Sequence, residues 1–390
     1  MEYRELIYLD NAATSYPKPP EVYSEMLRSV MQYGGNPGRG SHSLSVAAAE
    51  KVYECRALAA DMFGITEPER VFFTLNTTHG LNTVIKGVLQ KGDHVLLSDM
   101  EHNAVYRPIY KLAQKGIISY SLFGVTENGR AKDTNKICSD IIGKLRKNTR
   151  MVICSHSSNI CSLTLPIKEI GELCRRCGVL FVVDGAQSAG HEWISVDKMK
   201  IDALCVPGHK GLYGPQGSGM VILGKNISLD TLTEGGNGVN SLEGDMPSFS
   251  PERYEAGTLP TPAIAGLCEG LKFVKNIGIE RINEAEKRLY RAVRDDLTGC
   301  EGVRIYMPEG EGATLLFNVE GVGCEKVGRL LNEAGICVRS GYHCSALGHR
   351  TLGTEKSGAV RVSFGVFNGY GDAERLCEKV REITRMKERD

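Results

Sequence analysis

The sequence predicts an α/β protein with a large domain, built on a mostly parallel seven-stranded sheet, and a smaller C-terminal α+β domain. Seven short runs of apolar, largely β-branched residues lie between residues 71 and 224, and helix-period segments separate several of them. Strand and helix repeated in this way indicate a parallel sheet with right-handed crossovers. The apolar runs are nearly continuous, which is typical of strands covered on both faces.

The expected strands span 71–76, 94–99, 118–123, 151–156, 180–185, 203–207 and 219–224. The connection between the last two strands is short and rich in Gly, so these two are expected to form an antiparallel pair. Residues 225–262 are rich in Gly and Pro, which predicts an irregular loop.

The C-terminal third begins with two expected helices, at 261–277 and 282–297. Apolar strand candidates follow within 312–321, 336–340 and 359–365, with a helix at 324–335 and a closing helix from Asp372. We therefore predict an N-terminal arm (1–20), a large domain (21–260) and a small domain (261–390).

The composition excludes several classes of protein. Lys+Arg and Asp+Glu both number 47 in 390 residues, so a nucleic acid or an anionic membrane is not expected as the main partner. No run approaches the roughly 18 apolar residues of a membrane span. The N-terminus lacks a signal-peptide pattern, so a cytoplasmic location is expected. The thirteen cysteines predict reduced thiols, and the CxxC at Cys174 and Cys177 has no second thiol pair, so no metal site is expected.

Two charged residues follow neighbouring strands of the predicted sheet. Asp184 ends the apolar strand LFVVD, and Lys210 follows the next strand in a Gly-rich loop. Open α/β sheets bind ligands at the carboxyl ends of their strands, so both side chains can face one small molecule. Pyridoxal phosphate (PLP) needs both, because a lysine forms the Schiff base and an acid keeps the pyridine nitrogen protonated. A buried turn Asp and a solvated Lys remain the alternative.

Other polar residues also follow strand ends. Thr77 and Thr78 open a helix, where free N–H groups can hold a phosphate, although a Thr N-cap explains them equally well. His102 could stack on a flat ring or be an ordinary loop residue. Asn159 could reach a cofactor or substrate oxygen. Their convergence on one edge of the sheet favours a ligand site there.

The motifs form a specific set: YLDNAAT (8–14), NPGRGSHSLS (36–45), FTLNTTHGLN (73–82), MEHNAV (100–105), SSN (157–159), DGAQSAGH (184–191), PGHKGLYGPQGSG (207–219), YEAGT (254–258), VRSGYHC (338–344) and VRVSFGVFN (360–368). With these motifs the whole chain resembles the PLP-dependent cysteine desulfurases and selenocysteine lyases of the class V aminotransferase superfamily. The short stretch after Cys344 is most similar to the SUF-type (group II) enzymes.

The resemblance implies a homodimer of PLP fold-type I. Lys210 would bind PLP, Asp184 would pair with its pyridine nitrogen and His102 would stack on its ring. The other implied contacts are Gln187 to the phenolic oxygen; Thr77, Thr78, His209 and the partner subunit's Thr258 to the phosphate; and Arg361, Asn159, Arg39 and Arg339 to the substrate carboxylate.

The resemblance further implies that Cys344 is the catalytic nucleophile that accepts sulfur. The enzyme would convert L-cysteine to L-alanine, and the persulfide would pass to an acceptor protein, as in iron–sulfur cluster assembly. Arg339 and His343 are nearby groups that can carry positive charge, which favours a thiolate. Selenocysteine lyase, C–S β-elimination, transamination and a PLP-binding scaffold remain alternatives.

Three departures from the family pattern mark a divergent branch. Pro207 stands where a phosphate-binding Ser is usual, and His79 stands where a Glu is usual. The stretch GYHCSALGHRTLGT (341–354) differs from the common HHCAQP form.

Overall fold

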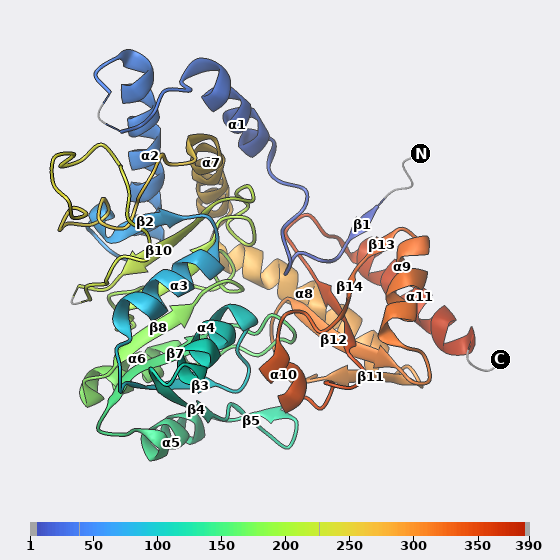
Figure 1. The fold of residues 1–390 in the computed structure, drawn as a ribbon. Helices are drawn as coiled ribbons and strands as arrows, with labels where there is room; N and C mark the ends of the chain where they lie inside the picture. The colour runs from blue at the N-terminus through green and yellow to red at the C-terminus, as the bar shows by residue number, and fades with distance from the viewer. Residues whose placement is uncertain (1–5, 39, 226, 387–390) are drawn as a thin grey trace.

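The computed structural model describes residues 6–38, 40–225 and 227–386, which form a larger and a smaller lobe (Figure 1). The larger lobe contains a seven-stranded sheet in the order β2-β10-β9-β8-β7-β3-β4. Its strands are β2 (Val71–Thr74), β3 (His94–Ser98), β4 (Ser119–Phe123), β7 (Thr149–Ser155), β8 (Leu180–Asp184), β9 (Ala203–Pro207) and β10 (Gly219–Leu223). These are the seven predicted strands. Only β10 runs antiparallel to its neighbours β2 and β9, so the mostly parallel sheet and its antiparallel pair are confirmed.

Helices bury both faces of this sheet, as the continuous apolar runs predict. Alternate strand residues point to opposite faces, so Phe72 and Phe73 belong to two different hydrophobic cores. One core packs against α3 (Thr77–Val88) and α4 (Asn103–Gln114). The other core contains side chains from α2 (Ser43–Met62), α5 (Thr134–Lys144), α6 (Ile167–Cys177) and α7 (Thr261–Ile277).

The smaller lobe is an α+β unit around an antiparallel sheet in the order β11-β12-β15-β14. The strands are β11 (Val303–Tyr306), β12 (Thr314–Val319), β14 (Arg339–Gly341) and β15 (Ala359–Ser363). Helices α8 (Ile279–Thr298), α9 (Cys324–Glu333) and α11 (Tyr370–Met386) pack in its core, and α10 (Ala346–Thr351) lies between β14 and β15. The N-terminal arm joins this lobe, because β1 (Ile7–Tyr8) pairs in parallel with β13 (Ile336–Cys337).

The packing of α7 bears on where the two lobes divide. Leu267 and Leu271 of α7 lie in the core of the large sheet, and α7 packs beside α2 and α1 (Pro20–Gln32) (Figure 1). Leu289 and Val293 of α8 lie in the core of the smaller lobe. We therefore propose that the division falls between α7 and α8, later than the boundary at 260 that the sequence predicts.

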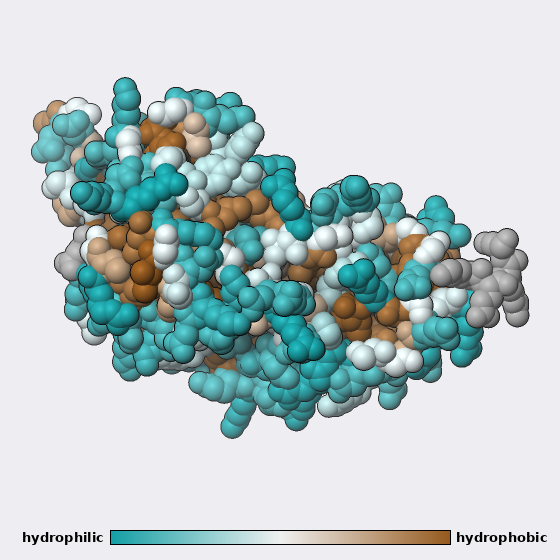
Figure 2. All heavy atoms as spheres, turned by 90° about the horizontal axis from the view of Figure 1, so that it is seen from below, coloured by the Kyte–Doolittle hydropathy of each residue, from teal (hydrophilic) through white to brown (hydrophobic). Residues whose placement is uncertain are grey.

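The long loop and the surface complete the fold. Residues 227–260 contain no helix or strand, in agreement with the predicted loop. A short hairpin, β5 (Thr126–Glu127) and β6 (Arg130–Ala131), follows β4. Within the described ranges, no helix has the length and apolarity needed to cross a bilayer. On the face seen in Figure 2, hydrophobic residues lie in separate patches within a mainly hydrophilic surface.

Candidate active site

One cavity at the carboxyl edge of the large sheet brings most of the predicted site residues together. Eight of the nine predicted cofactor-binding residues line it: Thr77, Thr78, His102, Asn159, Asp184, Gln187, His209 and Lys210. The strand order explains this convergence, because β8 ends at Asp184 and its neighbour β9 ends three residues before Lys210.

Asp184, which is buried, and Lys210, which is partly buried, are titratable groups that line the same cavity. The Asp184 side chain is only 3% exposed, and its Oδ1 accepts a hydrogen bond from the Ala186 N–H at 3.0 Å. Burial raises the pKa of Asp184 to about 6, although the charge of Lys210 opposes this shift. Burial likewise lowers the pKa of Lys210 to about 8, and Asp184 opposes that shift. Each charge is therefore poorly solvated and partly supported by the other, as in sites that await a charged ligand.

His102 is fixed in orientation by the helix that it starts. It is the N-cap of α4, and its Nδ1 accepts a hydrogen bond from the Ala104 N–H at 3.0 Å. Burial, together with the charge of Lys210, lowers the pKa of His102 to about 4. The ring is therefore neutral at pH 7 and carries its proton on Nε2.

The other end of the cavity has the features of an anion site. The N-cap of α3 is Asn76, whose side chain accepts from the His79 N–H at 2.9 Å, so the Thr N-cap is not what the structure contains. Thr77 Oγ1 and His209 Nδ1 are both buried and have no hydrogen-bond partner among the described residues. Two unsatisfied polar atoms beside a helix N-terminus fit a phosphate group. Pro207 lines the same cavity and offers no N–H or hydroxyl donor.

Arg361 lies beside the cavity and is 2% exposed. Its Nη2 donates to Asp10 Oδ1 at 2.6 Å and its Nη1 to the Asn159 carbonyl at 2.9 Å. Its Nε is buried and has no partner within the described part of the chain, so one donor is available for an anion. Arg339 Nε donates to the other oxygen of Asp10 at 3.1 Å, and Arg339 is about half exposed.

One predicted cofactor-binding residue, Thr258, does not reach this cavity in its own chain. It is exposed on the long loop. Arg39 lies outside the described residues.

The Cys344 loop of the smaller lobe lies against the cavity wall. The Asn103 N–H, next to His102, donates to the Cys344 carbonyl at 2.7 Å. Asn159 Nδ2 donates to the His343 carbonyl at 2.7 Å. Cys344 is one of two exposed cysteines, the other being Cys177, and all thirteen are free thiols.

The expectation that His343 and Arg339 are cations beside this thiol is wrong for His343. Burial lowers the pKa of His343 to about 3, so its ring is neutral at pH 7. The Arg339 guanidinium is paired with Asp10.

Several residues that support the site are not among the site residues predicted from the sequence. Asp10 bridges two arginines, and Glu101 lies buried behind the cavity, where it accepts from the Ser155 N–H at 2.9 Å. Burial raises the pKa of Glu101 to about 8. Lys18 Nζ donates to the His209 carbonyl at 2.7 Å. Asp10 and Glu101 lie in the motifs YLDNAAT and MEHNAV, and this was the available signal.

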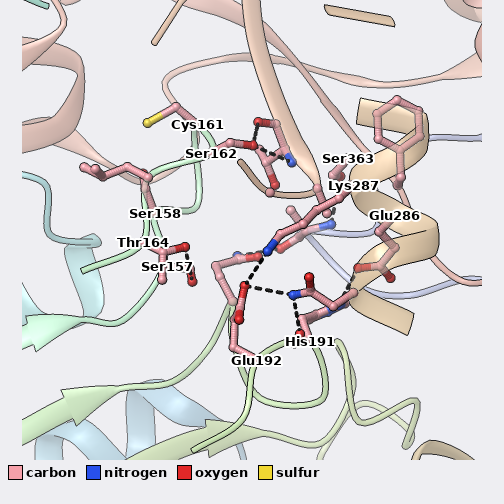
Figure 3. Close-up of a pocket in the computed structure, with 18 of the residues that line it drawn as sticks. Ser157, Ser158, Cys161, Ser162, Thr164, His191, Glu192, Glu286, Lys287 and Ser363 are labelled. Atoms are coloured by element: carbon pink, nitrogen blue, oxygen red, sulfur yellow. Dashed lines mark hydrogen bonds and ion pairs between the residues drawn. The ribbon is translucent and has the colours of Figure 1, made fainter. Parts of the chain in front are cut away.

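A second pocket lies between the lobes and shares Ser157 and Gln187 with the first (Figure 3). His191 Nδ1 is 2.7 Å from Glu286 Oε2, and Lys287 Nζ is 3.5 Å from Glu192 (Figure 3). These contacts tie the segment after β8, which carries Gln187, to α8 of the smaller lobe.

Comparisons with known proteins agree with this architecture. Residues 7–376 match the model of the family described as Aminotransferase class-V. A "Probable cysteine desulfurase" of Methanothermobacter thermautotrophicus is 32% identical over 98% of this chain and 96% of that protein. The "Cysteine desulfurase" of Haloferax volcanii is 30% identical over 96% and 88%, respectively. The apo structure of a cysteine desulfurase from Thermococcus onnurineus NA1 superposes with a TM-score of 0.88, at 31% identity and with 98% and 95% of the two chains covered. A match to the family model over nearly the whole chain means that this protein belongs to the aminotransferase class-V family.

Proposed function

We propose that the protein is a PLP-dependent cysteine desulfurase, which converts L-cysteine to L-alanine and receives the sulfur on Cys344. The observation that carries the proposal is the meeting of two features at the start of α4. His102 faces the cavity of Lys210 and Asp184, and the next residue, Asn103, binds the Cys344 carbonyl. The similarity to cysteine desulfurases over nearly the whole chain supports the same activity.

PLP is the cofactor that these residues fit. Lys210 would hold it covalently, Asp184 would pair with its ring nitrogen, and Thr77, Thr78 and His209 would bind its phosphate. The unpartnered Thr77 Oγ1 and His209 Nδ1 support this arrangement. Bound PLP supplies an electron sink that stabilises negative charge next to the substrate amine.

The surrounding residues would bind the substrate and move its protons. Arg361, with its free Nε, would bind the substrate carboxylate, and Asn159 would orient it. Lys210 would move the proton at the substrate Cα. Its pKa of about 8 suits this role, because a base that is poised near the working pH transfers protons most effectively.

Cys344 would act as the nucleophile. Its thiolate attacks the substrate sulfur, an S–S bond forms, and the Cβ–S bond breaks with its electron pair left on the carbon side. The carbon then takes up a proton, which gives alanine, and Cys344 is left as a persulfide. The exposure of Cys344 suits transfer of that sulfur to an acceptor protein. The short connection between Cys344 and β15, which contains α10, supports a relationship to the SUF-type (group II) enzymes. We also expect a cytoplasmic location.

We further propose a homodimer in which Thr258 completes the phosphate site of the partner subunit. The exposure of Thr258 and its absence from the cavity of its own chain support a contact across subunits. Closed two-fold pairing is the commonest way to share a site. We expect Thr258→Ala to weaken PLP binding while sedimentation still gives a dimer. A fully active monomer would overturn this proposal.

The decisive experiment measures alanine release from L-cysteine and from L-selenocysteine, with and without a reducing agent. A desulfurase releases alanine from L-cysteine, and turnover increases when the reductant removes the persulfide. Release from L-selenocysteine alone would identify a selenocysteine lyase. Pyruvate in place of alanine would identify β-elimination, and bound cofactor without turnover would identify a scaffold.

A further inference from the structure

The segment that carries Cys344 contains a buried chain of polar side chains with no assigned role. Thr354 Oγ1 lies 2.7 Å from His349 Nδ1, and His349 Nε2 lies 3.1 Å from His343 Nδ1. His343 Nε2 lies 3.3 Å from the Arg339 carbonyl oxygen. The side chains of His343, His349 and Thr354 are all buried. The chain therefore runs through the interior of the loop and ends one residue from the exposed thiol.

The end of this chain fixes the direction of every hydrogen bond in it. A carbonyl oxygen can only accept, so His343 Nε2 carries a proton and donates it to Arg339. Burial lowers the pKa of both imidazoles, so each ring is neutral at pH 7 and carries one proton. His343 Nδ1 must then accept from His349 Nε2–H, and His349 Nδ1 must accept from the Thr354 hydroxyl. Both histidines are thus Nε2–H tautomers.

The loop needs such support because its backbone is in an unfavourable conformation. His343 and Cys344 have φ values of +49° and +54°, in the left-handed region that residues other than Gly rarely adopt. Two backbone contacts hold them there, from Asn159 to the His343 carbonyl and from Asn103 to the Cys344 carbonyl. The His343 ring is the third attachment, and its position depends on His349 and Thr354. Strained backbone of this kind persists only where the surroundings determine it.

We propose that His349 and Thr354 are positioning residues, which hold the Cys344 thiol in place for sulfur uptake through a one-way chain of hydrogen bonds that ends on His343. The proposal rests on the nucleophilic role proposed for Cys344. It also gives a structural meaning to the divergent stretch GYHCSALGHRTLGT, which supplies all three side chains.

Two matched pairs of variants test the chain of hydrogen bonds. Thr354→Val removes the hydroxyl donor at nearly constant size, whereas Thr354→Ser keeps it. His349→Phe removes both ring nitrogens, whereas the amide of His349→Gln can still donate to His343 and accept from Thr354. We expect Thr354→Val and His349→Phe to slow alanine formation from L-cysteine roughly 10- to 100-fold, because small misplacements of a reacting group have effects of this size. Thr354→Ser and His349→Gln should retain most of the rate.

Two further readouts separate positioning from general damage to the fold. L-Selenocysteine turnover, which depends less on a thiol nucleophile, should change little in Thr354→Val, and the cofactor absorbance should not change. In the holoenzyme labelled with ¹⁵N-histidine, the ring nitrogen shifts should identify both His343 and His349 as Nε2–H tautomers at pH 7. The His349 variants assign these signals, and the wild-type spectrum tests the hydrogen-bond order even where a variant does not fold.

Three results would overturn the proposal. These are an Nδ1–H tautomer or a charged ring at either histidine, equal L-cysteine turnover in Thr354→Val and Thr354→Ser, and equal losses with both substrates. Cys344→Ala distinguishes failure of the underlying function. If that variant turns over L-cysteine normally, the nucleophilic role of Cys344 is wrong. If it is inactive while Thr354→Val equals Thr354→Ser, only the positioning role is wrong.

Discussion

The cavity around Lys210 and the loop around Cys344 lie next to each other, but different kinds of interaction hold their residues in place. The cavity is formed by the ends of parallel strands that are buried on both faces, so its residues are fixed by the largest cores of the molecule. The Cys344 loop has two left-handed residues and is held by a few side-chain contacts. The comparison separates a cofactor site that is held by the sheet from a sulfur site that is held by individual hydrogen bonds.

The largest expected effect is in the cavity. We expect Lys210→Ala to form no alanine and to carry no PLP that borohydride can fix to the protein, because Lys210 is the only lysine among the described residues that line the cavity. Absorbance and peptide mapping after reduction measure this. The solvated Lys200→Ala is the control and should behave as wild type. Reduced PLP on a peptide without Lys210 would contradict the site.

The next effect concerns the loop alone. We expect Cys344→Ala to keep the yellow cofactor and to lose L-cysteine turnover by roughly 10²- to 10³-fold, because the nucleophile is absent but no residue lining the cavity changes. L-Selenocysteine turnover should fall less, because a selenolate leaves more readily. Cys177→Ala, at the other exposed thiol, should be fully active. Normal L-cysteine turnover in Cys344→Ala would favour β-elimination or transamination.

The same division explains what the sequence could predict. All seven strands of the large sheet, and the placement of Asp184 and Lys210 after neighbouring strands, follow from apolar runs and strand ends. These signals are local. The α7 helix is also predicted with the bounds that the structure shows. Its packing against α1 and α2 cannot be predicted from its own apolar pattern, because these helices are far away in the sequence.

The loop could be identified only by resemblance. Local residue types suggested cations beside Cys344, whereas burial keeps His343 neutral. The ion pair between Asp10 and Arg361 joins residues that are 351 positions apart in the sequence, and residue spacing does not predict a contact over such a separation. The supporting contacts of the site are therefore what the sequence alone left undetermined.

A third prediction concerns Arg361, which lies between the cavity around Lys210 and the loop around Cys344. We expect Arg361→Lys to raise the KM for L-cysteine roughly 10- to 100-fold with a smaller change in kcat, because a lysine cannot hold Asp10 and the Asn159 carbonyl and still bind a carboxylate. The control is Arg339→Lys at the half-exposed arginine on the same aspartate. A larger KM effect in Arg339→Lys would assign the carboxylate to that residue.

The smallest expected effect is thermodynamic and concerns Asp184 without the cofactor. Burial raises its pKa from 3.8 to about 6, so the folded state holds a proton that the unfolded state has already released between these values. Stability is therefore lost as the pH rises from about 4 to 6, by up to roughly 3 kcal/mol for this group alone. The attraction to Lys210 is already included in this pKa, and without it the loss would be larger.

Asp184→Asn removes the buried charge and keeps the shape of the side chain. We expect the cofactor-free variant to be about 1–2 kcal/mol more stable than the cofactor-free wild type at pH 7, with the advantage shrinking as the pH falls toward 4. Urea unfolding at several pH values measures this. PLP should reverse the order, because the variant loses the partner of the ring nitrogen and gains less from binding. A variant that is less stable than wild type at pH 7 without PLP would mean that the attraction between Asp184 and Lys210 exceeds the cost of burying the carboxylate. The cavity would then be held by its charges as well as by its strands.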